Sequence, residues 1–501
     1  MNIEENKKID KFITIFPAIL IVLLCIFFII YPNNSNTILT NVRFFFGDTC
    51  SLYYLIFGIL TFIISIYMAF SKYGKIKLGS KNDKPEYSFL QWGGMMFCAG
   101  LAADILFYSL SEWLLYINES YINNFQDIYL TSITYSLFHW GFTPWSFYLV
   151  LASCFGFMIH CKNRNRQRFS EAVRPLFGKK IDGVLGKIID TLAIFALIAG
   201  CATTFSLATP LMTNIISTLL NIPSSKYITI ILLLFVCAIY ITSLLHGLKG
   251  INLLSKICMY IFIIFLLYIF IGSNKELYII KMGFLSILNL IKEIIPMYTY
   301  VDSIRNNSFP QNYTSFYWAY WMVWCVAAPF FIGQISKGRT IKQTILGGYT
   351  FGLLSTFISF IVLSNFTISL QLDNIVNLEE IYRNTNDLYY AIMSALSTLP
   401  FPKLSYIILF FSMLCFYATS FDSISLVASY YSYKNIYSNE IPSIKIKLFW
   451  AILLILFPIA LIFSDSSMAN LQAVSIISAF PIGIVIILII ISFFKDAKNS
   501  I

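Results

Sequence analysis

Two apolar stretches of the sequence carry aromatic residues at helical spacing. Residues 138–148 read FHWGFTPWSFY and residues 315–324 read SFYWAYWMVW, and together they contain five of the eight tryptophans. On a helix with about 100° between residues, one face of each stretch presents three rings, while Trp318 points elsewhere. The rings belong to Trp140, Trp145, Tyr148, Tyr320, Trp321 and Trp324. Two such faces in contact would form a cage that favours a quaternary ammonium group, because this cation has no N–H to donate and binds ring faces.

A carboxylate in the middle of an apolar stretch is the second unusual feature. Asp104 lies in FCAGLAADILFYSLSEW, residues 97–113, with no basic residue near it in the sequence. A charged group in the hydrocarbon core of a membrane is costly, so an intramembrane carboxylate indicates a role in proton or cation movement. Glu112 follows two turns later, nearer the predicted water boundary, and is interpreted as structural.

Two further groups of residues could bind an ion or do chemistry. The stretch YATSFDSIS, residues 417–425, places Thr419 and Ser420 side by side, and hydroxyl oxygens are hard ligands of the kind that bind Na⁺. His139 beside Trp140 could be the centre of a membrane-embedded transferase, but no polar loop rich in Asn or Asp accompanies it. We expect no cofactor beyond a coupling ion, H⁺ or Na⁺.

Each of these features has an ordinary structural alternative. With 17% aromatic residues in the chain, clustered rings can simply pack a core. Asp104 can be a hydrogen-bonded packing residue, His139 can pack between helices, and hydroxyls in membrane helices often bond back to their own backbone.

The elements that must position these residues are membrane-spanning helices. The chain is 58% hydrophobic and 12% charged, about half the charge of a soluble domain. Recurrent apolar runs of about 20 residues match the thickness of a bilayer and predict an all-α polytopic membrane protein. The twelve predicted spans are 12–31, 51–70, 88–116, 131–160, 187–219, 227–246, 251–272, 314–335, 344–367, 403–430, 444–464 and 467–494. The stretch 276–302 contains Lys281, Lys292 and Glu293, and is predicted to be an amphipathic helix at the interface.

The net charge of +10 predicts topology more than partners. The loop 161–187 alone carries eight basic residues, and the positive-inside rule then predicts that both termini are cytoplasmic. We expect the chain to lie in the cell (plasma) membrane. Because topology explains the basic loops, no nucleic-acid partner is expected.

Gly74 and Gly79 have P-loop spacing, but Ser80-Lys81 follows them in the wrong order for an ATPase site. Uphill transport must therefore use an ion gradient or solute exchange.

Small residues interrupt two of the predicted spans, 88–116 and 314–335. They include Gly93, Gly94, Gly100, Ala102 and Ala103 in the first span, and Ala319, Ala327, Ala328 and Gly333 in the second. Small residues permit close backbone approach or local unwinding. Interrupted helices at matching places in two halves are typical of transporters built from inverted repeats.

Several of these stretches resemble the betaine/carnitine/choline transporter family. FYWAYWMVW followed by ISKGRT is similar to the signature of that family, and FHWGFTPWSFY is similar to its His-Trp-Gly…Pro-Trp…Tyr helix. GLKGINLLS (247–255), TSFDS (419–423) and SFFKDAK (492–498) resemble further family motifs in the same order along the chain. The resemblance covers nearly the whole sequence.

The resemblance implies twelve transmembrane helices with a LeuT-type 5+5 inverted repeat, a homotrimer, and substrates that bear a trimethylammonium group, such as choline, glycine betaine or carnitine. It divides the chain into the tail and helices 1–2 (1–87), a first repeat of helices 3–7 (88–272), an amphipathic helix and loop (273–313), a second repeat of helices 8–12 (314–494) and a short cytoplasmic tail (495–501). By position, the six cage aromatics named above match the substrate-binding aromatics of the family.

Departures from the family pattern bear on coupling. Tyr320 stands where the family usually has Trp, and Gln334 replaces an Arg before Ile-Ser. Asp104 falls at a position where the proton-coupled, choline-type members of the family look to have an Asp. Proton symport is therefore the leading hypothesis. Na⁺ symport through Thr419 and Ser420 is the second, and exchange of the carnitine/γ-butyrobetaine kind the third. An amino-acid symporter of the same fold remains a further alternative.

Overall fold

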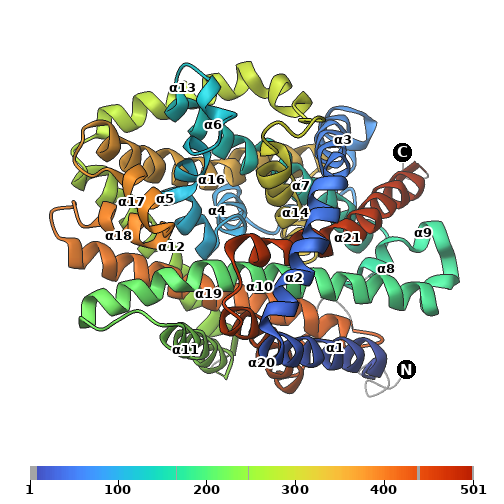
Figure 1. Ribbon diagram of the computed structural model, residues 1–501. Coiled ribbons are helices and arrows are strands. Elements are labelled where there is room, and N and C mark those ends of the chain that lie inside the picture. Colours follow the sequence, from blue (N-terminus) through green and yellow to red (C-terminus); the bar gives the residue numbers. More distant parts are fainter. Residues whose placement is uncertain (1–7, 165, 246, 437–439, 499–501) are drawn as a thin grey trace.

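The computed structural model describes residues 8–498 except 165, 246 and 437–439, and within that part the chain is all-helical (Figure 1). Eight described helical segments are long and apolar enough to cross a membrane. They are α1 (Lys11–Ile30), α3 (Ser51–Phe70), α6 (Ile128–His139) continued by α7 (Phe142–Gly156), α10 (Val184–Leu220), α16 (Ile341–Leu372), α19 (Pro402–Tyr431), α20 (Ile444–Phe463) and α21 (Met468–Ala497). The prediction of an all-α polytopic membrane protein is confirmed.

Three more candidate spans are pairs of helices that meet at a sharp bend. Helices α4 (Phe89–Ala99) and α5 (Ala103–Ile117) bend by 62°. Helices α14 (Ser315–Trp324) and α15 (Ala328–Ile335) bend by 56° when the preceding π-helical segment η7 (Pro310–Thr314) is joined to α14. Helices α12 (Gly247–Gly272) and α13 (Glu276–Thr299) meet at 112°. The described residues thus hold eight to eleven candidate spans. The remaining predicted span, 227–246, falls on α11 (Lys226–Leu245), whose apolar part is shorter.

The two gentler bends occur in the two spans that the sequence marks as interrupted. Between α4 and α5 the chain passes through Gly100, Leu101 and Ala102, with Ala102 in an extended conformation. Between α14 and α15 it passes through residues 325–327, and Pro329 occupies the first turn of α15, where its missing N–H costs nothing. The predicted interruption of both helices is confirmed. The full 5+5 repeat and the division into repeats stay predictions.

Helix α10 crosses the centre of the molecule and packs against α19, α20 and α21 (Figure 1). Helix α16 packs against α4, α5 and α7, while α14 lies against α10 and α21. Helices α4/α5, α7, α10 and α14 therefore enclose one interior region. Shorter helices complete the described fold: α2 (Pro32–Arg43), α8 (Phe169–Ala172), α9 (Arg174–Phe177), α17 (Leu378–Thr385), α18 (Leu388–Leu396), and the 3₁₀ and π segments η2 (Phe44–Thr49), η3 (Lys72–Lys75), η4 (Ile122–Asn124), η5 (Phe157–Cys161), η6 (Gly178–Asp182) and η7 (Pro310–Thr314).

Helix α13 departs from its neighbour α12 by more than a right angle and packs across α6 and α16. Its outer face exposes Phe284, Ile291 and Ile295, while Lys292 forms an ion pair with Glu293 at 2.9 Å. The exposed apolar side and the charged residues fit the amphipathic helix that the sequence predicts; its place at a membrane interface stays a prediction.

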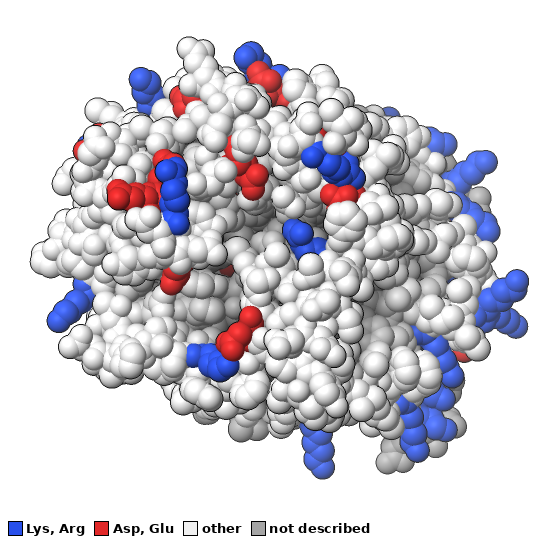
Figure 2. Space-filling view, viewed as in Figure 1, with Lys and Arg blue, Asp and Glu red and all other residues white. Residues whose placement is uncertain are grey.

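Charge is distributed unevenly over the visible surface (Figure 2). Lysine and arginine gather at the end of the molecule that carries α8, α9 and the C-terminal part of α21, and most visible acidic residues lie toward the opposite end. Many large apolar side chains are exposed, among them Ile19, Leu23 and Ile63. Extensive exposed apolar surface is expected of helices that face lipid.

The basic loop 161–187 is compact. Arg168 is buried and pairs with Asp190 of α10 at 3.1 Å, and its guanidinium also donates to the carbonyl oxygen of Tyr431 at 2.9 Å. On the loop surface, Arg174 donates to Asp182 at 2.8 Å, and this contact lowers the pKa of the Asp182 carboxyl. Arg168 and Arg174 of this loop therefore have internal partners in addition to any topological role.

Candidate substrate and coupling site

Trp321 of α14 is the centre of an aromatic cluster between α14 and the α6–α7 segment. Its ring centroid lies 5.8 Å from that of Trp140, 5.8 Å from that of Trp145 and 4.9 Å from that of Tyr148. Tyr320 joins the cluster through an edge-on contact with Trp140 at 6.5 Å. We call these five residues the cage. Five of the six aromatics predicted to converge therefore do so, from two stretches far apart in the sequence.

The sixth predicted residue, Trp324, lies apart from the cage. It is the last residue of α14 and is only half-buried, and its indole lies against Gly200 of α10, where an added Cβ would approach it to 3.3 Å. Trp318 also lies elsewhere, as the helical spacing predicts: it is buried against Phe138 and Tyr298, with ring centroids 5.4 and 5.9 Å away.

Trp145 occupies a slot that only glycines leave open. An added Cβ at Gly100, at the break between α4 and α5, would overlap the Trp145 indole, and so would one at Gly352 of α16. Glycine has no Cβ and permits this close approach of backbone to ring. The broken helix therefore shapes the cage as well as bending the span.

Asp104 lies in the first turn of α5 and touches the cage through Tyr320. The Tyr320 hydroxyl donates to Asp104 Oδ2 at 2.6 Å and also hydrogen-bonds to Thr204 of α10. The Asp104 side chain is buried, with 3% of the residue exposed, and its Oδ1 has no hydrogen-bond partner. The N-terminus of α5 directs its backbone N–H groups toward this carboxylate, which favours negative charge there.

Glu112 holds the opposite wall of the cage. Its Oε2 accepts from the Trp140 indole N–H at 2.7 Å, and its Oε1 accepts from the Tyr116 hydroxyl. Tyr116 in turn contacts His139 Nδ1 at 2.7 Å, and His139 Nε2 contacts Thr314 at 2.9 Å. This buried network positions Trp140. The sequence places Glu112 nearer the water boundary than Asp104, and nothing in the sequence connects it to Trp140.

Thr204 has no sequence signal at all, because it is one hydroxyl among many in a long apolar helix. Tyr108 and Phe360 were likewise not predicted, although their rings lie 5.6 and 5.4 Å from that of Trp140. These residues extend the cage wall beyond the motif residues.

The predicted sodium ligands Thr419 and Ser420 lie on α19, away from the cage. The Thr419 hydroxyl donates to the carbonyl oxygens of Cys415 and Phe416 on its own helix, at 3.1 and 3.0 Å. No hydrogen bond or ring contact among the described residues joins either hydroxyl to the cage or to Asp104. The side chains of the family motif GLKGINLLS (247–255) lie outside the part of the chain that the structure describes.

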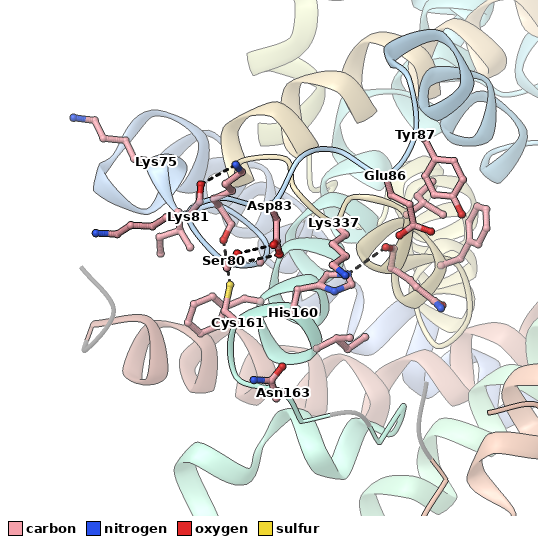
Figure 3. A pocket seen from close by; sticks show the side chains of 18 residues that line it. Lys75, Ser80, Lys81, Asp83, Glu86, Tyr87, His160, Cys161, Asn163 and Lys337 are labelled. Atoms are coloured by element: carbon pink, nitrogen blue, oxygen red, sulfur yellow. Dashed lines mark hydrogen bonds between the residues drawn. The ribbon is translucent and has the colours of Figure 1, made fainter. Parts of the chain in front are cut away.

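A separate cavity of about 1020 Å³ opens near the basic end of the molecule (Figure 3). It lies between the 75–87 segment, the end of the α7–η5 helix and the end of α15. Within it, Asp83 accepts from Ser80 and His160 contacts the carbonyl oxygens of Gly333 and Gln334. No cage residue lines this cavity, so it is not the aromatic site.

Comparison with known proteins identifies the family. The model of the betaine/carnitine/choline family of transporters matches residues 12–501, nearly the whole chain. The protein belongs to this family. The sequence-based resemblance is therefore confirmed, and members of the family are transporters, not enzymes. The transferase hypothesis is excluded on that ground, and both ring nitrogens of His139 already have partners.

Relatives of the chain include transporters of three related solutes. It is 27% identical to a carnitine transporter of Acinetobacter baumannii over 97% of this chain and 88% of the relative. It is 27% identical to the osmo-dependent choline transporter BetT2 of Acinetobacter baylyi, over 98% of this chain and 72% of the relative. It is also 27% identical to the glycine betaine transporter OpuD of Bacillus subtilis, over 94% of this chain and 91% of the relative. As a member of the betaine/carnitine/choline family, the chain is a multi-pass membrane transporter.

Proposed function

We propose that this transporter binds the trimethylammonium group of its substrate in the cage and couples its movement to protons through Asp104. The observation that carries the proposal is that Tyr320 belongs to both places: its ring lies in the cage and its hydroxyl bonds to Asp104. The leading mechanism is alternating access, in which the two bent helix pairs change their angle around the cage.

The cage is closed in this structure. Ring centroids 4.9–5.8 Å apart place neighbouring aromatic rings in direct contact. An ammonium centre sits within about 6 Å of each ring face that it contacts, so it must part these rings to enter. Substrate binding therefore requires the rings to separate, by rotation of the side chains or by movement of α14 relative to α7. A movement at this interface is the kind of rearrangement that alternating access needs.

Asp104 supports proton coupling because no basic side chain among the described residues neutralises the charge of its carboxylate. No lysine, arginine or histidine among the described residues forms an ion pair with it. Enclosing a carboxylate in a site without water disfavours its charged form. Closure of the helices over a substrate would dry the site and favour proton uptake, which links the two events. Na⁺ symport through Thr419 and Ser420 is the second candidate, although Thr419 already donates to its own helix.

The orientation of the chain in the membrane and its assembly are proposed from its charge distribution and its family. We infer that the basic end seen in Figure 2 faces the cytoplasm, which places both termini inside. A homotrimer in the plasma membrane is the assembly that the family resemblance implies.

The decisive experiment is uptake of labelled choline, glycine betaine and carnitine into proteoliposomes, with pH and Na⁺ gradients imposed separately. Wild-type protein and Asp104→Asn are compared, with Asp48→Asn as the control for loss of a carboxylate outside the site. We expect uptake driven by an inward proton gradient, lost in Asp104→Asn and kept in Asp48→Asn.

Other outcomes would point elsewhere. Uptake that needs a Na⁺ gradient and survives Asp104→Asn would favour the sodium mechanism. Uptake that needs only internal substrate would indicate an exchanger. Transport of amino acids but of none of the three solutes would favour the symporter alternative and refute the cage as an ammonium site.

A further inference from the structure

Tyr320 has two ends with different surroundings. Its ring packs beside Trp140 of the cage and stacks on Phe316 at 5.6 Å. Its hydroxyl leaves the cage and lies between Asp104 of α5 and Thr204 of α10. The three residues come from three different helices, so this one hydroxyl joins α5, α10 and α14.

The chemistry of these groups determines the direction of the two hydrogen bonds. A tyrosine hydroxyl has one hydrogen to donate and lone pairs to accept. While Asp104 is ionised it can only accept, so Tyr320 donates to it and Thr204 donates to Tyr320. When Asp104 binds a proton at Oδ2 it becomes a donor, and both hydrogen bonds can reverse between the same pairs of oxygen atoms; the neutral bonds are longer than the charge-assisted bond to the carboxylate. No net proton moves through Tyr320; only the proton bound by Asp104 is added.

Tryptophan, the residue usual in the family at this position, could not do this. An indole N–H only donates, so it can neither accept from Thr204 nor accept from a protonated Asp104. The departure from the family pattern therefore adds a group that responds to both charge states of Asp104.

The other titratable groups around Asp104 are weak competitors for this role. They are tyrosines, which carry no charge in their phenol form: Tyr108 on the same helix, Tyr148 of α7 and Tyr417 of α19. Glu112, the other buried carboxylate of α5, is already hydrogen-bonded by Trp140 and Tyr116. Among the described residues, Tyr320 alone hydrogen-bonds to the Asp104 side chain and belongs to the cage.

We propose that Tyr320 is a positioning residue that transmits the charge state of Asp104 to the cage wall through its hydroxyl. Reversal of its hydrogen bonds shifts the ring that contacts Trp140, and this makes substrate affinity depend on pH. The inference rests on the proposed function, because it requires a substrate in the cage and a proton on Asp104.

The test measures the ratio of dissociation constants at pH 5.5 and pH 8, using whichever of labelled choline, glycine betaine or carnitine the wild-type protein binds in detergent. Two variants remove the reversible hydroxyl: Tyr320→Phe keeps a ring without a polar group, and Tyr320→Trp restores the residue usual in the family. Tyr54→Phe is the matched control, because the buried Tyr54 hydroxyl donates to Ile476 at 2.8 Å far from the site. Thermal unfolding shows which variants fold.

We expect the two dissociation constants of the wild-type protein to differ about tenfold, which corresponds to about 1.4 kcal/mol. The ratio should be at least threefold smaller in Tyr320→Phe and in Tyr320→Trp. It should be unchanged in Tyr54→Phe. If either folded Tyr320 variant keeps the wild-type ratio, the proposed role of Tyr320 is wrong while the proposed function stands. If the wild-type protein binds none of the three solutes, the proposed function fails and the role of Tyr320 fails with it. Should Tyr320→Phe not fold, the comparison with Tyr320→Trp decides.

Discussion

Glu112 accepts a hydrogen bond from the indole N–H of Trp140 at 2.7 Å, across 28 positions of sequence. The contact joins α5 to the junction of α6 and α7, and it orients a cage ring from outside the cage. A hydrogen bond to a buried charged group contributes about 1.5–3 kcal/mol, and leaving its partner unsatisfied is costly. We therefore expect Glu112 to position Trp140, which is compatible with the structural role suggested by the sequence.

Replacing Glu112 tests this role. Glu112→Leu should raise the KM for the transported solute by about tenfold or more, since it leaves the Trp140 N–H and the Tyr116 hydroxyl without an acceptor. Glu112→Gln keeps one carbonyl oxygen and should have a smaller effect. The double variant Glu112→Leu with Trp140→Phe should show strong non-additivity in KM. Purely additive effects would contradict the assignment.

Trp321 should dominate substrate affinity because it contacts three other cage rings. Trp321→Leu removes one ring face and should weaken binding by roughly 30-fold, which corresponds to about 2 kcal/mol for a desolvated cation–π contact. Trp318→Leu is the matched control, since this tryptophan is equally buried on the same helix but packs outside the cage. Both variants should lose stability; equal losses of affinity in both would refute the cage.

Gly100 offers a test of the slot that holds Trp145. Gly100→Ala places a methyl group where the indole lies, so it should displace Trp145 and reduce transport by at least tenfold, with a loss of stability of about 1–3 kcal/mol from overpacking. Gly94→Ala on the same bent segment meets nothing within 4 Å and should be tolerated. Uptake assays and thermal unfolding of the two variants separate the effect of the slot from a general effect on α4.

Arg168 should be important for stability rather than for transport specificity. It is buried between Asp190 and the carbonyl oxygen of Tyr431, and removing one partner of a buried ion pair costs about 3–5 kcal/mol. Arg168→Gln should lower the melting temperature in detergent clearly. Arg383→Gln removes an exposed pair with Glu379 on a helix surface, which contributes about 0.5 kcal/mol, and should change it little. A melting temperature that is the same in both variants would show that the buried pair contributes nothing.

Much of the architecture can be predicted from the sequence, because the bilayer imposes simple requirements. Spans need about 20 apolar residues, and small residues mark helices that bend; both patterns are visible in single stretches of sequence. Helical spacing also identifies five aromatics that converge and sets Trp318 apart, but it wrongly groups Trp324 with them. These are local properties, and the structure agrees with them at α4/α5 and α14/α15.

The sequence by itself determined the family, the helical membrane class and five of the residues that converge in the cage. Only the tertiary structure decided that Trp324 lies apart, that Glu112 holds Trp140 and that Tyr320 bonds to Asp104 and Thr204. The physical reason is that periodicity reports which residues share a face of one helix, whereas a hydrogen bond between helices depends on their relative position and rotation. Those are set by packing across the whole bundle, and no single stretch of sequence contains them.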